Sequence, residues 1–117
     1  MPAGTVDPVM FASFERETVG ILDPALRSWA LQALLAGLPY EARIRERNRA
    51  LRAAAELLGD VSATERVRLL RSKLQAVRRA IKPAHPDFST LEGCLARALL
   101  ARDVVPTERQ LWRILDR

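Results

Sequence analysis

The sequence is short of the residues that most catalytic and metal sites require. It has one cysteine and one histidine, which excludes an internal disulfide and a multi-cysteine metal site. His85 stands between two prolines with no oriented partner for acid–base work, and no serine has a His–Asp pair to activate it. There is no glycine-rich phosphate loop. We therefore expect a protein that is not an enzyme and that has no metal site and no cofactor.

Long apolar runs are also missing. The most apolar stretch, residues 29–38, contains Gln32 and is about half the length that a membrane span needs. The N-terminus has neither the charged region nor the apolar core of a signal peptide. The single Cys94 suits a reducing compartment. We expect a cytoplasmic protein that does not associate with a membrane.

Proline and glycine are few, but they stand where helices begin and end. Proline is favoured in the first turn of a helix and glycine just past its end. Three such pairs follow one another: Pro8 and Gly20, Pro24 and Gly37, Pro39 and Gly59. Capping boxes beginning at Ser62, Ser89 and Thr107 open three more helices. Helices are predicted near 8–19, 24–36, 40–58, 62–82, 90–102 and 108–116.

No stretch alternates as a strand would, so the predicted fold class is all-α, a bundle of about six helices. We expect residues 1–117 to form a single helical domain. Within it, a four-helix part covers 7–82, a linker 83–89, and a C-terminal helix pair 90–117. Helix 24–36 is apolar almost all round, which favours a central place in the core or, alternatively, a homodimer interface.

Helices 40–58 and 62–82 are predicted to form a central antiparallel hairpin, because the link between them is too short for any other arrangement. Each has apolar residues that share one face at helical spacing. On the first helix these residues are Ile44, Leu51, Ala55 and Leu58; on the second they are Val67, Leu70, Leu74, Val77 and Ile81.

Charge is unevenly spread along the chain. The net charge is +5, but residues 41–82 carry +7, residues 1–40 carry −2, and residues 83–117 are neutral. Such asymmetry indicates a polyanionic partner for the middle segment. A genome that favours arginine codons and an ordinary solvated helix face would give a similar pattern, and this second explanation stays open.

The basic residues of the first hairpin helix lie on the face opposite its apolar residues, and those of the second occupy a flank about 100° wide that contains no acidic residue. Guanidinium groups suit phosphate because they offer a planar fork of donors that stays charged. The candidate nucleic-acid contacts in the hairpin are Arg45, Arg49, Arg52, Arg68, Arg71, Arg78, Arg79 and Lys82. The hypothesis requires these side chains to form one continuous cationic surface that is open to solvent.

Residues 100–115 carry a second pattern. Ala101 is a small residue where two helices would cross, Thr107 caps the second helix, and Ile114-Leu115 would hold that helix to the core. These residues resemble the helix-turn-helix of bacterial transcription regulators. The resemblance implies that the second helix reads the major groove, with Arg109, Gln110, Arg113 and Arg117 pointing outward. The turn departs from the motif, because Val105 stands where a glycine is usual and Pro106 follows it.

Two functions follow as hypotheses. The first is DNA binding, regulatory or tolerant of sequence, with duplex DNA as the partner. The second is a protein–protein adaptor or inhibitor whose arginine faces bind an acidic protein surface, as small helical proteins of phage and mobile elements do. In the second case helix 24–36 or helix 8–19 would form a homodimer.

Overall fold

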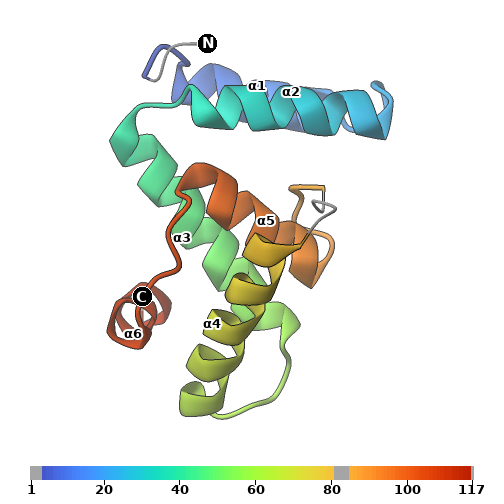
Figure 1. The fold of residues 1–117 in the computed structure, drawn as a ribbon. Coiled ribbons are helices and arrows are strands. Elements are labelled where there is room, and N and C mark those ends of the chain that lie inside the picture. Colours follow the sequence, from blue (N-terminus) through green and yellow to red (C-terminus); the bar gives the residue numbers. More distant parts are fainter. Residues whose placement is uncertain (1–3, 81–84, 117) are drawn as a thin grey trace.

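The computed structural model describes residues 4–80 and 85–116, and every regular element in them is an α-helix. The all-α prediction is confirmed (Figure 1). Six helices lie where the prolines, glycines and capping boxes predicted them, within a few residues at each end. The helices are α1 (Pro8–Glu17), α2 (Pro24–Ala36), α3 (Tyr40–Leu57), α4 (Ala63–Arg79), α5 (Leu91–Ala101) and α6 (Glu108–Leu115).

Side-chain caps explain the helix starts. Asp7 and Asp23 accept hydrogen bonds from the first free N–H groups of α1 and α2, which a helix cannot satisfy internally. At α6, Thr107 and Gln110 form the complete reciprocal box that the sequence predicts. At α5 the cap is Thr90, which accepts from the Gly93 N–H, one residue later than the predicted Ser89.

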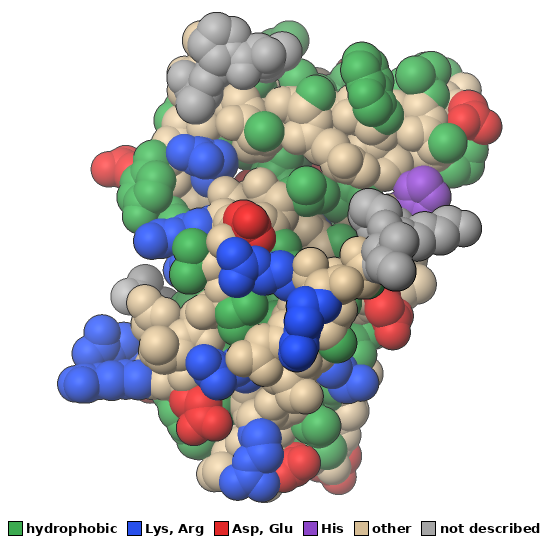
Figure 2. All heavy atoms as spheres, viewed as in Figure 1, with side chains coloured by type: hydrophobic (Ala, Val, Ile, Leu, Met, Phe, Trp, Pro, Cys, Tyr) green, Lys and Arg blue, Asp and Glu red, His purple; other side chains and the backbone are tan. Residues whose placement is uncertain are grey.

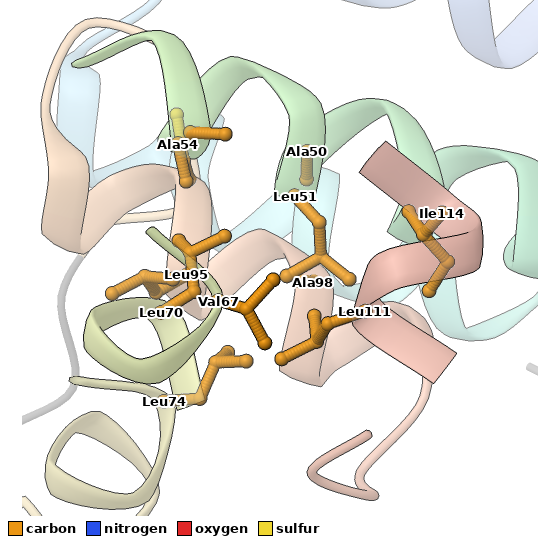
Figure 3. Close-up of a cluster of buried hydrophobic side chains, with 12 residues drawn as sticks. Ala50, Leu51, Ala54, Val67, Leu70, Leu74, Leu95, Ala98, Leu111 and Ile114 are labelled. Carbon is orange, nitrogen blue, oxygen red and sulfur yellow. The ribbon is translucent and has the colours of Figure 1, made fainter. Parts of the chain in front are cut away.

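The hydrophobic interior has two parts. A lower cluster joins α3, α4, α5 and α6, and Figure 3 shows side chains from all four helices converging there, among them Leu51, Leu70, Leu95 and Leu111. An upper cluster joins α1 and α2 to the start of α3 and the end of α5. Because Ala101 belongs to this upper cluster, α5 contributes to both.

Helix α5 is the central helix of the fold. It packs most extensively on α3 and also contacts α4 and α2. By comparison, α3 and α4 contact each other less extensively. The predicted apolar face of α4 is buried at Val67, Leu70 and Leu74, but much of what it meets is α5. Ile81, the last residue of that predicted face, lies outside the described residues.

The prediction of a central place for helix 24–36 is wrong. Only Ser28, Leu31 and Leu35 of α2 are buried, while Trp29 is 68% exposed and Leu26 is 51% exposed. Figure 1 shows α1 and α2 side by side at one end of the molecule, away from α4 and α6. Uniform apolarity did not reveal which face of α2 the rest of the chain covers.

Gly93 is needed for the close packing of α5. A Cβ at this position would lie 2.8 Å from the backbone oxygen of Asp87 and 2.9 Å from that of His85. Glycine in a helix interior costs about 1 kcal/mol relative to alanine. Here it lets the segment that holds the buried Pro86 lie directly against the helix.

Candidate nucleic-acid interface

The rotation of α4 about its axis decides which of its side chains face solvent. Its N-cap Ser62 accepts a hydrogen bond from the Glu65 N–H at 3.2 Å. Val67, Leu70 and Leu74 lie on the side of the helix that is buried. Helical geometry then places a basic stretch on the neighbouring side. We call this stretch the arginine flank: Arg68, Arg71, Gln75, Arg78 and Arg79.

Part of the arginine flank borders a groove. The groove holds about 580 Å³ and lies between α4 and the chain that leads from α5 to α6. Its described lining is Arg71, Gln75, Arg78, Arg79, Val104 and Val105. It therefore combines cationic side chains on one wall with two aliphatic side chains on the other, and no carboxylate belongs to that lining.

The arginines of the flank differ in how well they are neutralised. Arg78 pairs with Asp103 at 3.0 Å and Arg68 with Glu65 at 3.5 Å; both arginines and Asp103 are exposed, and Glu65 is partly exposed. Exposed pairs of this kind contribute at most about 1 kcal/mol, so a phosphate can compete for these arginines.

Arg71 and Arg79 have no ion pair with any carboxylate in the described part of the chain. The Arg79 Nε donates to the Gln75 backbone oxygen at 3.1 Å, which leaves its terminal nitrogens for another acceptor. The Arg71 Nε is buried and has no hydrogen-bond partner within residues 4–80 and 85–116. These two residues are the least compensated cations of the flank.

The three arginines predicted as nucleic-acid contacts on α3 do not all extend the arginine flank of α4. Arg52 donates from Nε to the backbone oxygen of Ile114 at 3.0 Å, so it ties α3 to α6. Arg49 lies 3.6 Å from Glu15 and 3.7 Å from Glu46, with its guanidinium over the ring of Phe88. Arg45 is exposed. The structure thus brings the α4 arginines together but gives two of the three α3 arginines other contacts. The single cationic surface over both helices that the hypothesis required is therefore not formed, and the candidate interface is reduced to the arginine flank of α4.

Arg97 is a charged residue that lies in the core. It is 1% exposed, and its guanidinium donates to both carboxylate oxygens of Glu15 and to Glu46 at 2.8 Å. The rings of Phe11 and Phe88 lie against it, at 5.5 and 4.4 Å from their centroids. We call Arg97, Glu15, Glu46 and Arg49 the Arg97 cluster; its two cations balance its two carboxylates.

The Arg97 cluster keeps its central cation charged. Burial disfavours the charged guanidinium, but the hydrogen bonds and charges of Glu15 and then of Glu46 outweigh that effect, and the pKa of Arg97 is raised above its ordinary value. The cluster joins α1, α3 and α5. Its role in the described structure is to hold the α1–α2 end on the rest of the fold.

The C-terminal helices do not pack as the helix-turn-helix resemblance implies. The connection covers residues 102–107, and no residue other than glycine has a positive φ in the described chain, so Val105 takes no left-handed turn. Ala101 packs toward α1 and α2, and α6 packs mainly on α3 and α4. The close crossing of the two helices is therefore absent.

Helix α6 still presents polar residues to solvent. Arg109 and Arg113 are exposed opposite the buried Leu111 and Ile114. The Gln110 side chain accepts from the Thr107 N–H at 2.9 Å, so its carbonyl is occupied by the cap. Two predicted contacts, Lys82 and Arg117, lie outside the described residues.

A second basic group was missed by the sequence reasoning. Arg43 and Arg102 lie over the ring of Tyr40, at 5.9 and 5.7 Å from its centroid, and Arg102 donates to the Tyr40 hydroxyl at 2.8 Å. Burial and then the positive charge of Arg102 lower the pKa of Arg47. The spacing of Tyr40, Arg43 and Arg47 along one helical face was visible in the sequence, but Arg102 comes from a distant part of it.

Figure 2 shows how charge is distributed on one side of the molecule. Basic side chains gather over the region of α4 and α6, with some acidic side chains among them. The stretch formed by α2 presents hydrophobic and uncharged atoms, with charged side chains at its ends. On this side of the molecule, charged side chains are therefore more frequent over α4 and α6 than over α2.

Other kinds of site find no support within residues 4–80 and 85–116. No group of three or more His, Cys, Asp or Glu side chains in that part is arranged to hold a metal ion. None of the helices described there combines the length and the apolarity that crossing a bilayer takes. Cys94 is a buried free thiol, and burial, followed by the charge of Asp87, raises its pKa.

Comparison with known proteins adds no relative from which a function could be carried over. No protein-family model, no curated protein and no solved structure matches this chain. The candidate interface therefore stands on the geometry of its own residues.

Proposed function

We propose that the protein is a cytoplasmic nucleic-acid-binding protein, not an enzyme, and that it binds duplex DNA through the arginine flank of α4. The observation that carries the proposal is the groove beside Arg71 and Arg79, two arginines with no carboxylate partner in the described chain. Neutralising several phosphates releases condensed counterions, which is the main source of sequence-independent affinity for DNA.

The length of the flank fits a phosphate backbone. Arg68 and Arg79 are about 16 Å apart along the axis of α4 at 1.5 Å per residue. Duplex DNA carries one charge per roughly 1.7 Å of its axis, so several phosphates face a surface of this length. The exposed Arg78 and Arg68 can exchange their weak ion pairs for phosphate.

We propose binding that tolerates many sequences. Base readout needs side chains free to form bidentate contacts in the major groove. Arg109 and Arg113 remain available for backbone or base contacts on α6, but the carbonyl of Gln110 serves the helix cap. Phosphate contacts alone carry no sequence information, so the salt dependence of binding is the property to measure.

The test is fluorescence anisotropy with a labelled duplex of about 25 base pairs between 50 and 200 mM salt. We expect the double variant Arg71→Gln/Arg79→Gln to bind at least about tenfold more weakly and to flatten the log–log salt slope by about 2. Arg16→Gln on α1 removes an exposed charge far from α4 and serves as the control.

Two outcomes contradict the proposal. One is undetectable binding of the unaltered protein near 50 mM salt; the other is an equal loss of affinity, per charge removed, in the Arg16→Gln control. If duplex DNA fails while an acidic polypeptide binds and depends on Arg71 and Arg79, the surface belongs to an acidic protein partner. That result would favour the adaptor or inhibitor hypothesis.

A further inference from the structure

Helix α2 has its polar side chains turned inward. Arg27 donates to the Thr18 hydroxyl at 3.0 Å and to the Glu15 backbone oxygen at 2.6 Å. Ser28 is buried, and Gln32 donates to it at 3.4 Å. The polar residues that this helix possesses therefore contact its own chain.

The side of α2 that faces solvent is apolar. We call it the α2 outer face, and it consists of Ala25, Leu26, Trp29, Ala33 and Ala36, all exposed. Isolated exposed apolar residues are ordinary, but a continuous helix face with no charged residue is unusual on a monomer. An ordinary surface helix turns its apolar side to the core and its polar side to solvent, and α2 does the reverse.

More apolar side chains are exposed on α1 and on the turn that joins it to α2. The turn between α1 and α2 exposes Val19 and Ile21 at 66% and 77%, and α1 exposes Val9 and Met10 at 74% and 65%. The α1–α2 end of the molecule is therefore rich in exposed apolar side chains, and a two-helix contact there falls at the small end of the size range of specific interfaces, which is centred on roughly 800 Å² per partner.

We propose that the α2 outer face binds the same face of a second copy of this chain, forming a two-fold symmetric dimer. A two-fold interface must complement itself. Antiparallel pairing of the helices about a point midway between Trp29 and Ala33 sets Trp29 against the partner's Ala33. The same register sets Leu26 against the partner's Ala36, so each large side chain meets a small one.

The charges at this end of the molecule favour a second copy of the chain over an anionic membrane or nucleic acid as the partner. The exposed charged residues of α1, α2 and their N-caps are Asp7, Glu17 and Asp23, against Arg16, and the segment 1–40 has a net charge of −2. An anionic membrane or nucleic acid would meet an acidic border. A dimer formed here keeps the basic α4 flanks of the two copies apart, and antiparallel helix dipoles oppose one another favourably.

The experiment measures oligomeric state by sedimentation equilibrium from about 1 to 100 µM. We expect the unaltered protein to pass from monomer to dimer within this range, because a small two-helix interface associates weakly. Ala33→Glu places a carboxylate from each copy at the centre of the interface, and we expect the dissociation constant to rise by about 100-fold or more. Ala76→Glu introduces the same change at an exposed alanine of α4 and should leave the dimer intact.

A second readout follows Trp29 directly. In a Trp112→Phe background Trp29 is the remaining tryptophan, and its emission should shift to shorter wavelength as the protein dimerises. Ala33→Glu should abolish that concentration dependence while leaving the helical circular dichroism unchanged, because Ala33 is exposed.

The proposal is overturned if the protein stays monomeric at 100 µM, or if Ala76→Glu dissociates it as much as Ala33→Glu does. It is also overturned if the monomer binds lipid vesicles through Trp29, since the face would then serve a lipid surface. It does not rest on the proposed nucleic-acid binding, because a monomer could still bind duplex DNA through Arg71 and Arg79.

Discussion

Helices α2 and α4 are both amphipathic, yet they face their surroundings in opposite ways. On α4 the apolar Val67, Leu70 and Leu74 are buried and the charged side chains face solvent. On α2 the polar Arg27 and Ser28 are held inward, and Trp29 faces solvent. Apolar content alone therefore does not locate the core, because α4 turns charged side chains to solvent whereas α2 turns apolar side chains there.

The largest effect is expected where the two regions are joined. Arg97→Met removes the buried cation that holds Glu15 of α1 and Glu46 of α3 and leaves their carboxylates poorly compensated. Breaking a buried ion pair by deleting one partner costs about 3–5 kcal/mol. Urea denaturation followed by circular dichroism should show a loss of this size.

A matched triple variant sharpens that result. Arg97→Met combined with Glu15→Gln and Glu46→Gln also removes the two carboxylate charges and leaves only Arg49, whose side chain is 55% exposed and can be solvated. Part of the lost stability should therefore return. If the triple variant is as unstable as Arg97→Met alone, the cost comes from packing around Phe11 and Phe88 and not from uncompensated charge.

The second prediction compares one leucine from each region. Leu70→Ala on α4 empties a fully buried position and should cost about 2–5 kcal/mol, since the cavity adds to the lost transfer free energy. Leu26→Ala on α2, at 51% exposure, should change the stability of the monomer by less than about 0.5 kcal/mol. Its effect should appear instead as a weaker dimer in sedimentation.

Equal destabilisation by the two substitutions would contradict the difference between α2 and α4. It would mean that Leu26 is buried within the monomer, and that α2 is covered by its own chain. Denaturation at a protein concentration below the dimer dissociation constant separates the two contributions.

The third prediction concerns Gly93, which lies in the helix between the two regions. Gly93→Ala gains helix propensity of about 1 kcal/mol, but the new methyl group meets the backbone oxygens of Asp87 and His85 within 3 Å. We expect the clash to prevail and the protein to lose about 1–3 kcal/mol, the usual cost of overpacking. A gain in melting temperature would show instead that the 85–89 segment yields readily.

The sequence predicts the helices well and the contacts between them less well. The bounds followed from local chemistry, because prolines, glycines and capping residues such as Asp23 and Thr107 act on their own helix. The apolar stripe of α4 was equally local. That α5 would pack across α3 and α4 was not predictable, since periodicity names a buried face and not the element that covers it.

The residues of the candidate site also differ in whether one helix alone or the tertiary fold determines their contacts. The arginine flank of α4 was predictable, since its members share one helix face. That Arg49 would join the Arg97 cluster and Arg52 would bind the Ile114 backbone depended on α1, α5 and α6 folding back. Arg97, a charge in the middle of the otherwise apolar run from Gly93 to Ala101 of α5, was a visible anomaly, but the carboxylates that hold it come from distant positions.

The smallest expected effect concerns Cys94, which belongs to the lower cluster. Its pKa is raised above the unfolded value by burial and then by Asp87, so the fold favours the neutral thiol. That contribution is complete below the unfolded pKa, about 8.5, and is lost as pH rises through the folded pKa. The stability of the unaltered protein should therefore fall more steeply than that of Cys94→Ala above about pH 8.5.

The difference between the two slopes is limited to about 1.4 kcal/mol per pH unit, the value for one proton. Urea titrations from about pH 7 to pH 10 measure it, with Cys94→Ala as the control for every other group that titrates in this range. Parallel slopes would mean that the thiol ionises as readily in the fold as in the unfolded chain. The interior around α5 would then be open to water, unlike the buried side of α4 with which it is continuous.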